Sequence, residues 1–173
     1  MLRFARLCNF LVALTVSSAA FSQAQQSAAP VPTQILASNK AFISNAGLDA
    51  AAAAAFQREG NPNRPYNQFY AAMKSWGRYE LVATPSDADL ILEIRFTAPA
   101  TPCGDATCYA PQLGLAILDA KTHFTLWTLL EPVNGAFRKA TWDKNVNQGM
   151  TNLMNDVKKL AGPSPSTRES ARN

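Results

Sequence analysis

The chain has 173 residues, 47% of them hydrophobic, and carries 16 Lys and Arg against 12 Asp and Glu, a formal net charge of +4 at pH 7. Two of the basic residues, Arg3 and Arg6, lie at the very start, and without them the balance is 14 against 12. A nucleic-acid-binding protein needs a concentrated basic face. The nearly balanced remainder therefore argues against a nucleic-acid partner.

Residues 1–24 have the pattern of a secretory signal peptide: two arginines, an apolar run over residues 10–16, and small residues leading to a cleavage site near Ala24. The apolar run is shorter than the ~20 residues that a membrane-spanning helix needs. Cys8 precedes this run, whereas the lipid-bearing cysteine of a lipoprotein must follow it. We therefore expect an exported protein, periplasmic or secreted, that is soluble after cleavage and has no transmembrane helix or lipid anchor.

The remaining chain is long enough for one domain with its own core. Residues 25–33 and 163–173 are poor in large apolar side chains, so neither stretch can bury enough surface to offset the entropy lost on ordering. We predict a flexible lead-in over 25–33, a single domain over 34–162, and a disordered tail over 163–173.

In chain order, the first predicted elements are a strand over residues 39–47 and a helix in the Ala-rich stretch at 48–60, which has high helix propensity. Over residues 65–76, large apolar side chains recur at steps of three and four, which indicates a helix that Gly77 can end. These side chains are Tyr66, Phe69, Tyr70, Met73 and Trp76. An aromatic stripe with this spacing is typical of a helix that packs on a sheet.

Four apolar segments follow, and their composition and alternation indicate strands. They cover residues 78–83, 88–98, 112–118 and 124–130, and the turn at 119–123 joins the last two into a hairpin. In the second segment Leu90, Leu92, Ile94 and Phe96 share one face, while Asp89, Ile91, Glu93 and Arg95 share the other. We expect the first face to lie in the core.

An amphipathic helix over residues 145–162 closes the domain, with Lys158 and Lys159 in its last turn and Gly162 at its end. The order of the main elements is strand, helix, four strands, helix. It predicts an α+β fold, a two-layer sandwich in which helices cover a mostly antiparallel sheet of four to five strands.

Two cysteines remain after removal of the signal peptide, Cys103 and Cys108, and in an exported protein such a pair is read first as a disulfide, here closing a short loop. Free thiols or a metal site are the alternatives. Because His123 is the only histidine and no second cysteine pair exists, a four-ligand zinc site is short of ligands. A redox-active pair usually has two residues between its cysteines, and here there are four.

The acids Asp87 and Asp89, one residue apart, could belong to a cation site with Glu93. They also suit a turn and the start of a strand, because aspartate side chains bond nearby backbone N–H groups. We favour the second interpretation. His123 lies in a predicted turn, and the chain has no nucleophile motif beside it. The sequence thus indicates no catalytic residue, no cofactor and no metal.

One group of motifs resembles a known family. A helix leads into a Gly-Arg-Tyr-x-Leu-Val strand, an Ala-Asp pair opens the next strand, and an Asp-x-x-Thr hairpin follows. The matching residues are Gly77, Arg78, Tyr79, Leu81, Val82, Ala88, Asp89, Asp119 and Thr122. The chain is similar in these motifs to small exported bacterial envelope domains of unknown function, often lipoproteins. It is more distantly similar to the N-terminal domain of the Tol translocation protein and to the curli-secretion and penicillin-binding-protein-activator lipoproteins.

The resemblance implies a non-catalytic interaction or assembly domain of the cell envelope with one or more protein partners. The alternative is a small secreted enzyme or ligand-binding protein with a site in the groove between helix and sheet. Trp142 lies near Arg138 and Lys139 in a stretch that fits neither strand nor helix. Because an aromatic side chain exposed among charges is typical of a protein-binding anchor, these three are the candidate partner-binding residues.

Overall fold

The structure of the protein is a computed structural model that describes residues 29–58 and 61–162. The predicted signal peptide, residues 25–28 of the predicted lead-in and the predicted tail lie outside the described residues. Among the residues described, no helix is long and apolar enough to span a bilayer.

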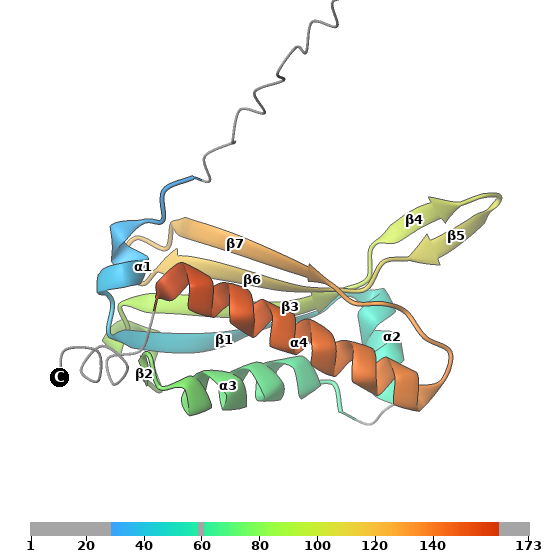
Figure 1. The fold of residues 1–173 in the computed structure, drawn as a ribbon, viewed down its shortest axis with the longest axis horizontal. Coiled ribbons are helices and arrows are strands. Elements are labelled where there is room, and N and C mark those ends of the chain that lie inside the picture. The colour runs from blue at the N-terminus through green and yellow to red at the C-terminus, as the bar shows by residue number, and fades with distance from the viewer. Residues whose placement is uncertain (1–28, 59–60, 163–173) are drawn as a thin grey trace, which may run out of the picture.

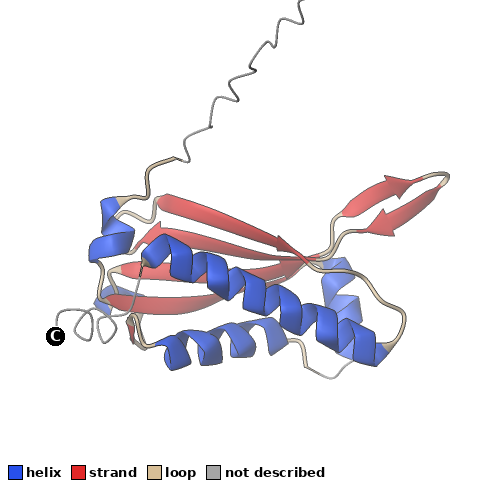
Figure 2. Ribbon diagram, viewed as in Figure 1, coloured by secondary structure: helices blue, strands red, loops and turns tan. Residues whose placement is uncertain are grey.

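Figures 1 and 2 show the helices and strands of the described chain. The helices are α1 (Thr33–Ala37), α2 (Ala50–Arg58), α3 (Arg64–Trp76) and α4 (Lys139–Ala161). The strands are β1 (Lys40–Leu48), β2 (Glu80–Leu81), β3 (Leu90–Thr97), β4 (Ala100–Cys103), β5 (Ala106–Tyr109), β6 (Gln112–Asp119) and β7 (Thr125–Pro132). A short 3-10 turn at Pro85–Asp87 precedes β3.

The predicted α+β class is confirmed, and the main sheet has five strands in the order β2-β1-β3-β6-β7. The sheet is mixed rather than mostly antiparallel. Strands β3, β6 and β7 pair antiparallel, but β1 pairs in parallel with both β2 and β3. The reason is the connection, because α2 and α3 carry the chain from the end of β1 back to the end at which β1 began. A crossover through helices produces parallel neighbours.

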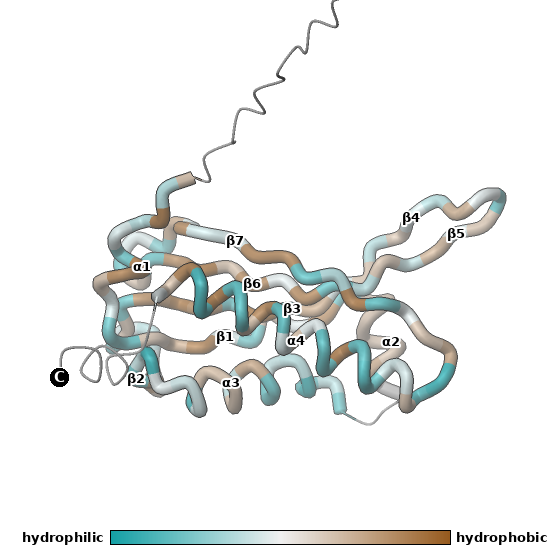
Figure 3. Tube along the Cα trace, viewed as in Figure 1, coloured by the Kyte–Doolittle hydropathy of each residue, from teal (hydrophilic) through white to brown (hydrophobic). Residues whose placement is uncertain are grey.

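The core lies between one face of this sheet and the two helices α3 and α4, which Figure 2 shows side by side over that face. The period-two prediction for β3 is confirmed, since Leu90, Leu92, Ile94 and Phe96 are at most 1% exposed. The inward positions of β6 are Leu113, Leu115 and Ile117, and α4 adds Val146, Leu153 and Val157. Figure 3 shows the matching alternation of hydrophilic and hydrophobic segments along α4. Each such burial stabilises the fold by ~1.5–3 kcal/mol.

A buried arginine fixes α1 to the start of the sheet. Arg78 donates hydrogen bonds from its guanidinium to the carbonyl of Leu36 at 2.7 Å and to that of Ser38 at 3.1 Å. Its guanidinium carbon lies 4.8 Å from the ring centroid of Tyr79, whose hydroxyl donates to the carbonyl of Ile35 at 3.0 Å. Burial raises the pKa of the Tyr79 hydroxyl. Because carbonyls at a helix C-terminus carry partial negative charge, they can hold this buried cation without a carboxylate.

Candidate functional site

The two acids in front of β3 act as acceptors for nearby donors. Asp89 accepts hydrogen bonds from the backbone N–H groups of Asn39 and Lys40, both at 2.9 Å, and these bonds hold the pKa of the Asp89 carboxyl below its usual range. Asp87 accepts from the Thr84 hydroxyl at 2.6 Å. Asp89 thus joins β3 to the start of β1. Over residues 29–58 and 61–162, no group of three or more His, Cys, Asp and Glu side chains is placed to hold a metal ion.

His123 is an exposed residue of the turn between β6 and β7 and has a left-handed backbone, with φ of 60°. Asp119 organises this turn by accepting from the N–H groups of Thr122 at 2.7 Å and Lys121 at 3.0 Å and from the Thr122 hydroxyl. These bonds hold the pKa of the Asp119 carboxyl below its usual range. The turn lies at the end of the sheet opposite the β4–β5 hairpin (Figure 1). His123 is thus placed as an exposed residue of a turn that Asp119 holds together.

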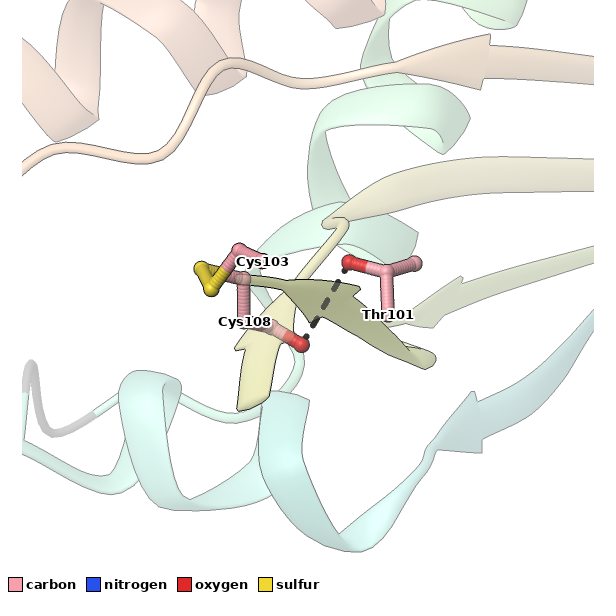
Figure 4. The surroundings of a disulfide bond; sticks show 3 residues. All are labelled: Thr101, Cys103 and Cys108. Carbon is pink, nitrogen blue, oxygen red and sulfur yellow. Dashed lines mark hydrogen bonds between the residues drawn. A yellow bond between two sulfur atoms is a disulfide. The ribbon is translucent and has the colours of Figure 1, made fainter. Parts of the chain in front are cut away.

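Strands β4 and β5 form a two-stranded hairpin that projects from the domain (Figure 1); we call residues 100–109 the arm. The predicted loop here is a hairpin whose tip is Gly104 and Asp105, with Gly104 at φ of 66°. Cys103 and Cys108 are joined by a disulfide, with their Cα atoms 5.7 Å apart. Figure 4 shows this disulfide and the 3.5 Å contact from the Thr101 hydroxyl to the carbonyl of Cys108. Almost every side chain of the arm is exposed.

An apolar groove of about 830 Å³ lies at the root of the arm; we call it the groove. One wall is the Ala-rich helix α2, with Ala51, Ala54 and Ala55. The second wall is the root of the arm, residues 107–109, and the third is the loop at residues 135–137 that precedes α4. Small alanine side chains leave the space open, and the other lining groups are almost all apolar. The groove can therefore bind an apolar segment but has few groups for acid–base chemistry.

Two aromatic rings, those of Phe96 and Trp142, form the floor of the groove, and Phe56 packs against both and joins them to the core. Phe56 and Phe96 pack edge to face with ring centroids 5.0 Å apart, and Trp142 lies 5.9 Å from each. Trp142 stands in the first turn of α4, a segment that the sequence left unassigned, and it is half-buried rather than exposed. Its indole Nε1 is buried with no hydrogen-bond partner among the described residues.

Two exposed aromatic residues stand at the rim of the groove. Phe137 has 110% of its reference exposure and Tyr109 has 59%. Sequence reasoning singled out neither of them, although an aromatic residue inside the polar loop Asn-Gly-Ala-Phe-Arg was a usable signal. The groove also depends on α2 and the arm, which are distant from this loop in sequence. The candidate partner-binding aromatic ring is thus half-buried in the floor, and the exposed ring belongs to Phe137.

Of the two predicted basic residues, Lys139 lines the groove and Arg138 occupies the N-cap position of α4. Lys139 is the one charged residue among the described residues of the lining, and its ammonium donates to Asp143 at 2.8 Å. Asp143 also pairs with Arg64, which tethers α4 to α3. Hydrogen bonds from Lys139 and Arg64 hold the pKa of the Asp143 carboxyl below its usual range.

No family model and no curated protein matches the chain. Among solved structures, a PelC variant crystallised as a dodecamer, from Paraburkholderia phytofirmans, is 11% identical, with 72% of this chain and 86% of that chain covered and a TM-score of 0.45. A homologue of the neuraminyllactose-binding hemagglutinin from Helicobacter pylori is 12% identical over 73% and 87%, with a TM-score of 0.42.

A third solved structure, lipoprotein GNA1162 from Neisseria meningitidis, is 10% identical over 68% of this chain and 99% of that chain, with a TM-score of 0.28. At these identities and TM-scores we transfer no ligand, partner or assembly state to the chain. The finer resemblance to the Tol, curli-secretion and penicillin-binding-protein-activator domains stays a prediction.

Proposed function

We propose that the chain is an exported, non-catalytic interaction or assembly domain of the bacterial envelope and that it docks an apolar protein segment in the groove. The signal-peptide pattern supports export. The observation that carries the docking proposal is the groove itself, which is open, mostly apolar and rimmed by the exposed side chains of Phe137 and Tyr109.

The rim explains why a protein segment is the favoured occupant. An aromatic ring buries 150–250 Å² when it is fully covered, which amounts to ~4–6 kcal/mol at about 25 cal/mol per Å². Phe137 leaves that surface in water in the isolated chain. Aromatic anchors near the centre of an apolar patch carry much of the binding energy of protein interfaces. A partner that covers Phe137 and Tyr109 therefore gains affinity without any change in the fold.

The alternative function, an enzyme or ligand carrier, would place its site between the helices and the sheet. In the described residues, core side chains fill that interface; they include Phe69, Met73, Leu115 and Leu153. Among the described residues that line the groove Lys139 is the one charged group, and no second ionisable side chain of this part of the chain converges on it from the lining. The docking function fits this arrangement better.

Photo-crosslinking in the producing cell tests the proposal. A benzophenone amino acid replaces Phe137, Tyr109 or, as the matched control, Phe124, which is 74% exposed at the opposite end of the sheet. We expect discrete protein adducts from the two rim positions and none from the control. Equal adduct patterns from all three positions, or no adducts from the rim, would refute the docking function.

A further inference from the structure

The arm carries a single charge. Between Arg95 and Asp119 the chain has one charged residue, Asp105, and it stands at the tip of the arm. Figure 3 shows the strongest hydrophilic colour of the arm at this tip, with paler colours along the two strands. Small side chains of alanine, threonine and proline make up most of the rest. The arm is thus a narrow, nearly apolar hairpin with one negative charge at its end.

The arm extends into solvent without a second layer to support it. A two-stranded hairpin is marginally stable in water by itself, and the side chains of β5 are all exposed. The Cys103–Cys108 disulfide braces the hairpin next to its tip. A braced hairpin that covers none of its own domain's core contributes little to that core. Its projecting shape suits it to contact with another molecule.

The groove matches the arm in shape and charge. Its walls are lined by small side chains, among them Ala51, Ala54 and Ala55, which leave room for a hairpin of small residues. Lys139 is the one charged side chain among the described lining residues; it shares Asp143 with Arg64, so this cluster of two cations and one carboxylate keeps a net charge of +1, opposite in sign to Asp105. A hairpin tip that enters the groove would place Asp105 near Lys139 while its apolar residues cover Phe137.

The arm cannot fill the groove of its own copy. Its root, residues 107–109, already forms one wall of that groove, and its tip points away from the domain (Figure 1). In a second copy that faces the first, each arm can reach the other groove. Because each root lies beside its own groove, both exchanges can occur around one two-fold axis, as in an isologous dimer.

We infer that the groove is occupied by the arm of a second copy of this chain, in a reciprocal exchange that pairs Asp105 of each copy with Lys139 of the other. This inference names the occupant of the groove and rests on the proposed docking function. The resulting dimer is the unit that this exported domain presents to the envelope.

Charge reversal tests the exchange on the exported, processed protein, with mass measured by light scattering after size exclusion. We expect a dimer for the parent chain. For Asp105→Lys and for Lys139→Glu we expect the dissociation constant of the dimer to rise at least about tenfold, because each substitution places like charges together. An equal mixture of the two variants restores the dimer, since each tip then meets a groove of opposite charge. Lys159→Glu, an exposed charge reversal at the far end of α4, leaves the dimer unchanged.

The far-ultraviolet circular dichroism of every variant is recorded, so that a folding failure is separated from a lost contact. A parent chain that stays monomeric, a dimer that both reversals leave intact, or a mixture that fails to restore it overturns the exchange. Rim crosslinks to a different protein, with a monomeric parent chain, overturn the exchange and leave the docking function standing. Absence of any crosslink from positions 109 and 137 refutes both the exchange and the docking function.

Discussion

The two ends of the five-stranded sheet use similar side chains in opposite ways. At the end near α1, Arg78 and Tyr79 are buried, and their polar atoms bond the carbonyls that end this helix. At the end near the arm, Phe137 and Tyr109 stand in solvent. The first end stabilises the fold through hydrogen bonds between these buried side chains and backbone carbonyls, whereas the second leaves apolar surface uncovered. Under the proposed docking function, this uncovered apolar surface is where another chain binds.

The largest expected effect comes from the same substitution at a core position and at the rim. Phe69→Ala removes a side chain that is 0% exposed beneath the sheet, and we expect a loss of about 3–5 kcal/mol in the free energy of unfolding. Phe137→Ala removes a fully exposed ring and should stay within about 0.5 kcal/mol of the parent. Urea denaturation measures the free energy of unfolding of both variants and of the parent. A large loss in Phe137→Ala would mean that the rim belongs to the core.

The next effect concerns the end near α1. Arg78→Met keeps much of the side-chain volume but removes two hydrogen bonds to the carbonyls of Leu36 and Ser38, and we expect a loss of about 2–3 kcal/mol. Arg78→Lys should recover part of this, because a lysine can reach a carbonyl without the planar fork of arginine. Thermal unfolding ranks the three proteins. Equal stability of Arg78→Met and the parent would show that the guanidinium contributes nothing to this end.

Replacing a helix glycine should change the free energy of unfolding by a smaller amount. Here we expect alanine to destabilise the protein, although it usually stabilises a helix relative to glycine. Gly149 lies in α4 where an added Cβ would come within 2.8 Å of Val133 Cγ2. Gly149→Ala therefore costs about 1–2 kcal/mol, although alanine is the better helix former by about 1 kcal/mol. Combining it with Val133→Ala removes the clash, so the double variant should lose less than the two separate losses summed. Stabilisation by Gly149→Ala alone would contradict this packing of α4.

The smallest expected effect is a pH dependence of the stability difference between Asp89→Asn and the parent. The pKa of the Asp89 carboxyl is lowered in the folded state by the N–H groups of Asn39 and Lys40, so its stabilising contribution is present above the unfolded pKa of about 3.9. This contribution is lost as the pH falls through the folded pKa. Asp89→Asn should therefore melt below the parent at pH 7, and the difference should shrink as the pH falls below about 4. A difference independent of pH would exclude this role of the carboxylate.

The sequence predicted the parts of the fold that depend on local pattern. The alternation of Leu90, Leu92, Ile94 and Phe96 placed β3 in the core because a strand turns every second side chain to one face. The sheet was predicted to be mostly antiparallel, whereas β1 is parallel to both of its neighbours because helices connect it to the next strand. The hairpin of the arm has no alternation, since solvent covers both of its faces, and no pattern could reveal its strands.

The candidate site was only partly predictable for two physical reasons. The start of α4 carries no capping signal, because Arg138 occupies the N-cap position and makes no side-chain cap bond. Trp142 therefore could not be assigned to a helix, nor its ring to the half-buried floor. The groove joins α2, the arm and the loop before α4, three segments that are not neighbours in the sequence. Only the packed fold brings them together.

The most direct measurement of the docking function fills the groove without touching the core. Ala54 is an exposed wall residue of the groove, so Ala54→Trp should occupy the space that an incoming segment needs while the melting temperature stays close to that of the parent. The same cells produce both proteins with the benzophenone amino acid at position 137, and the yield of adduct is compared. We predict that Ala54→Trp loses most of the adduct. An undiminished adduct from a stably folded variant would contradict the claim that the groove is the docking surface.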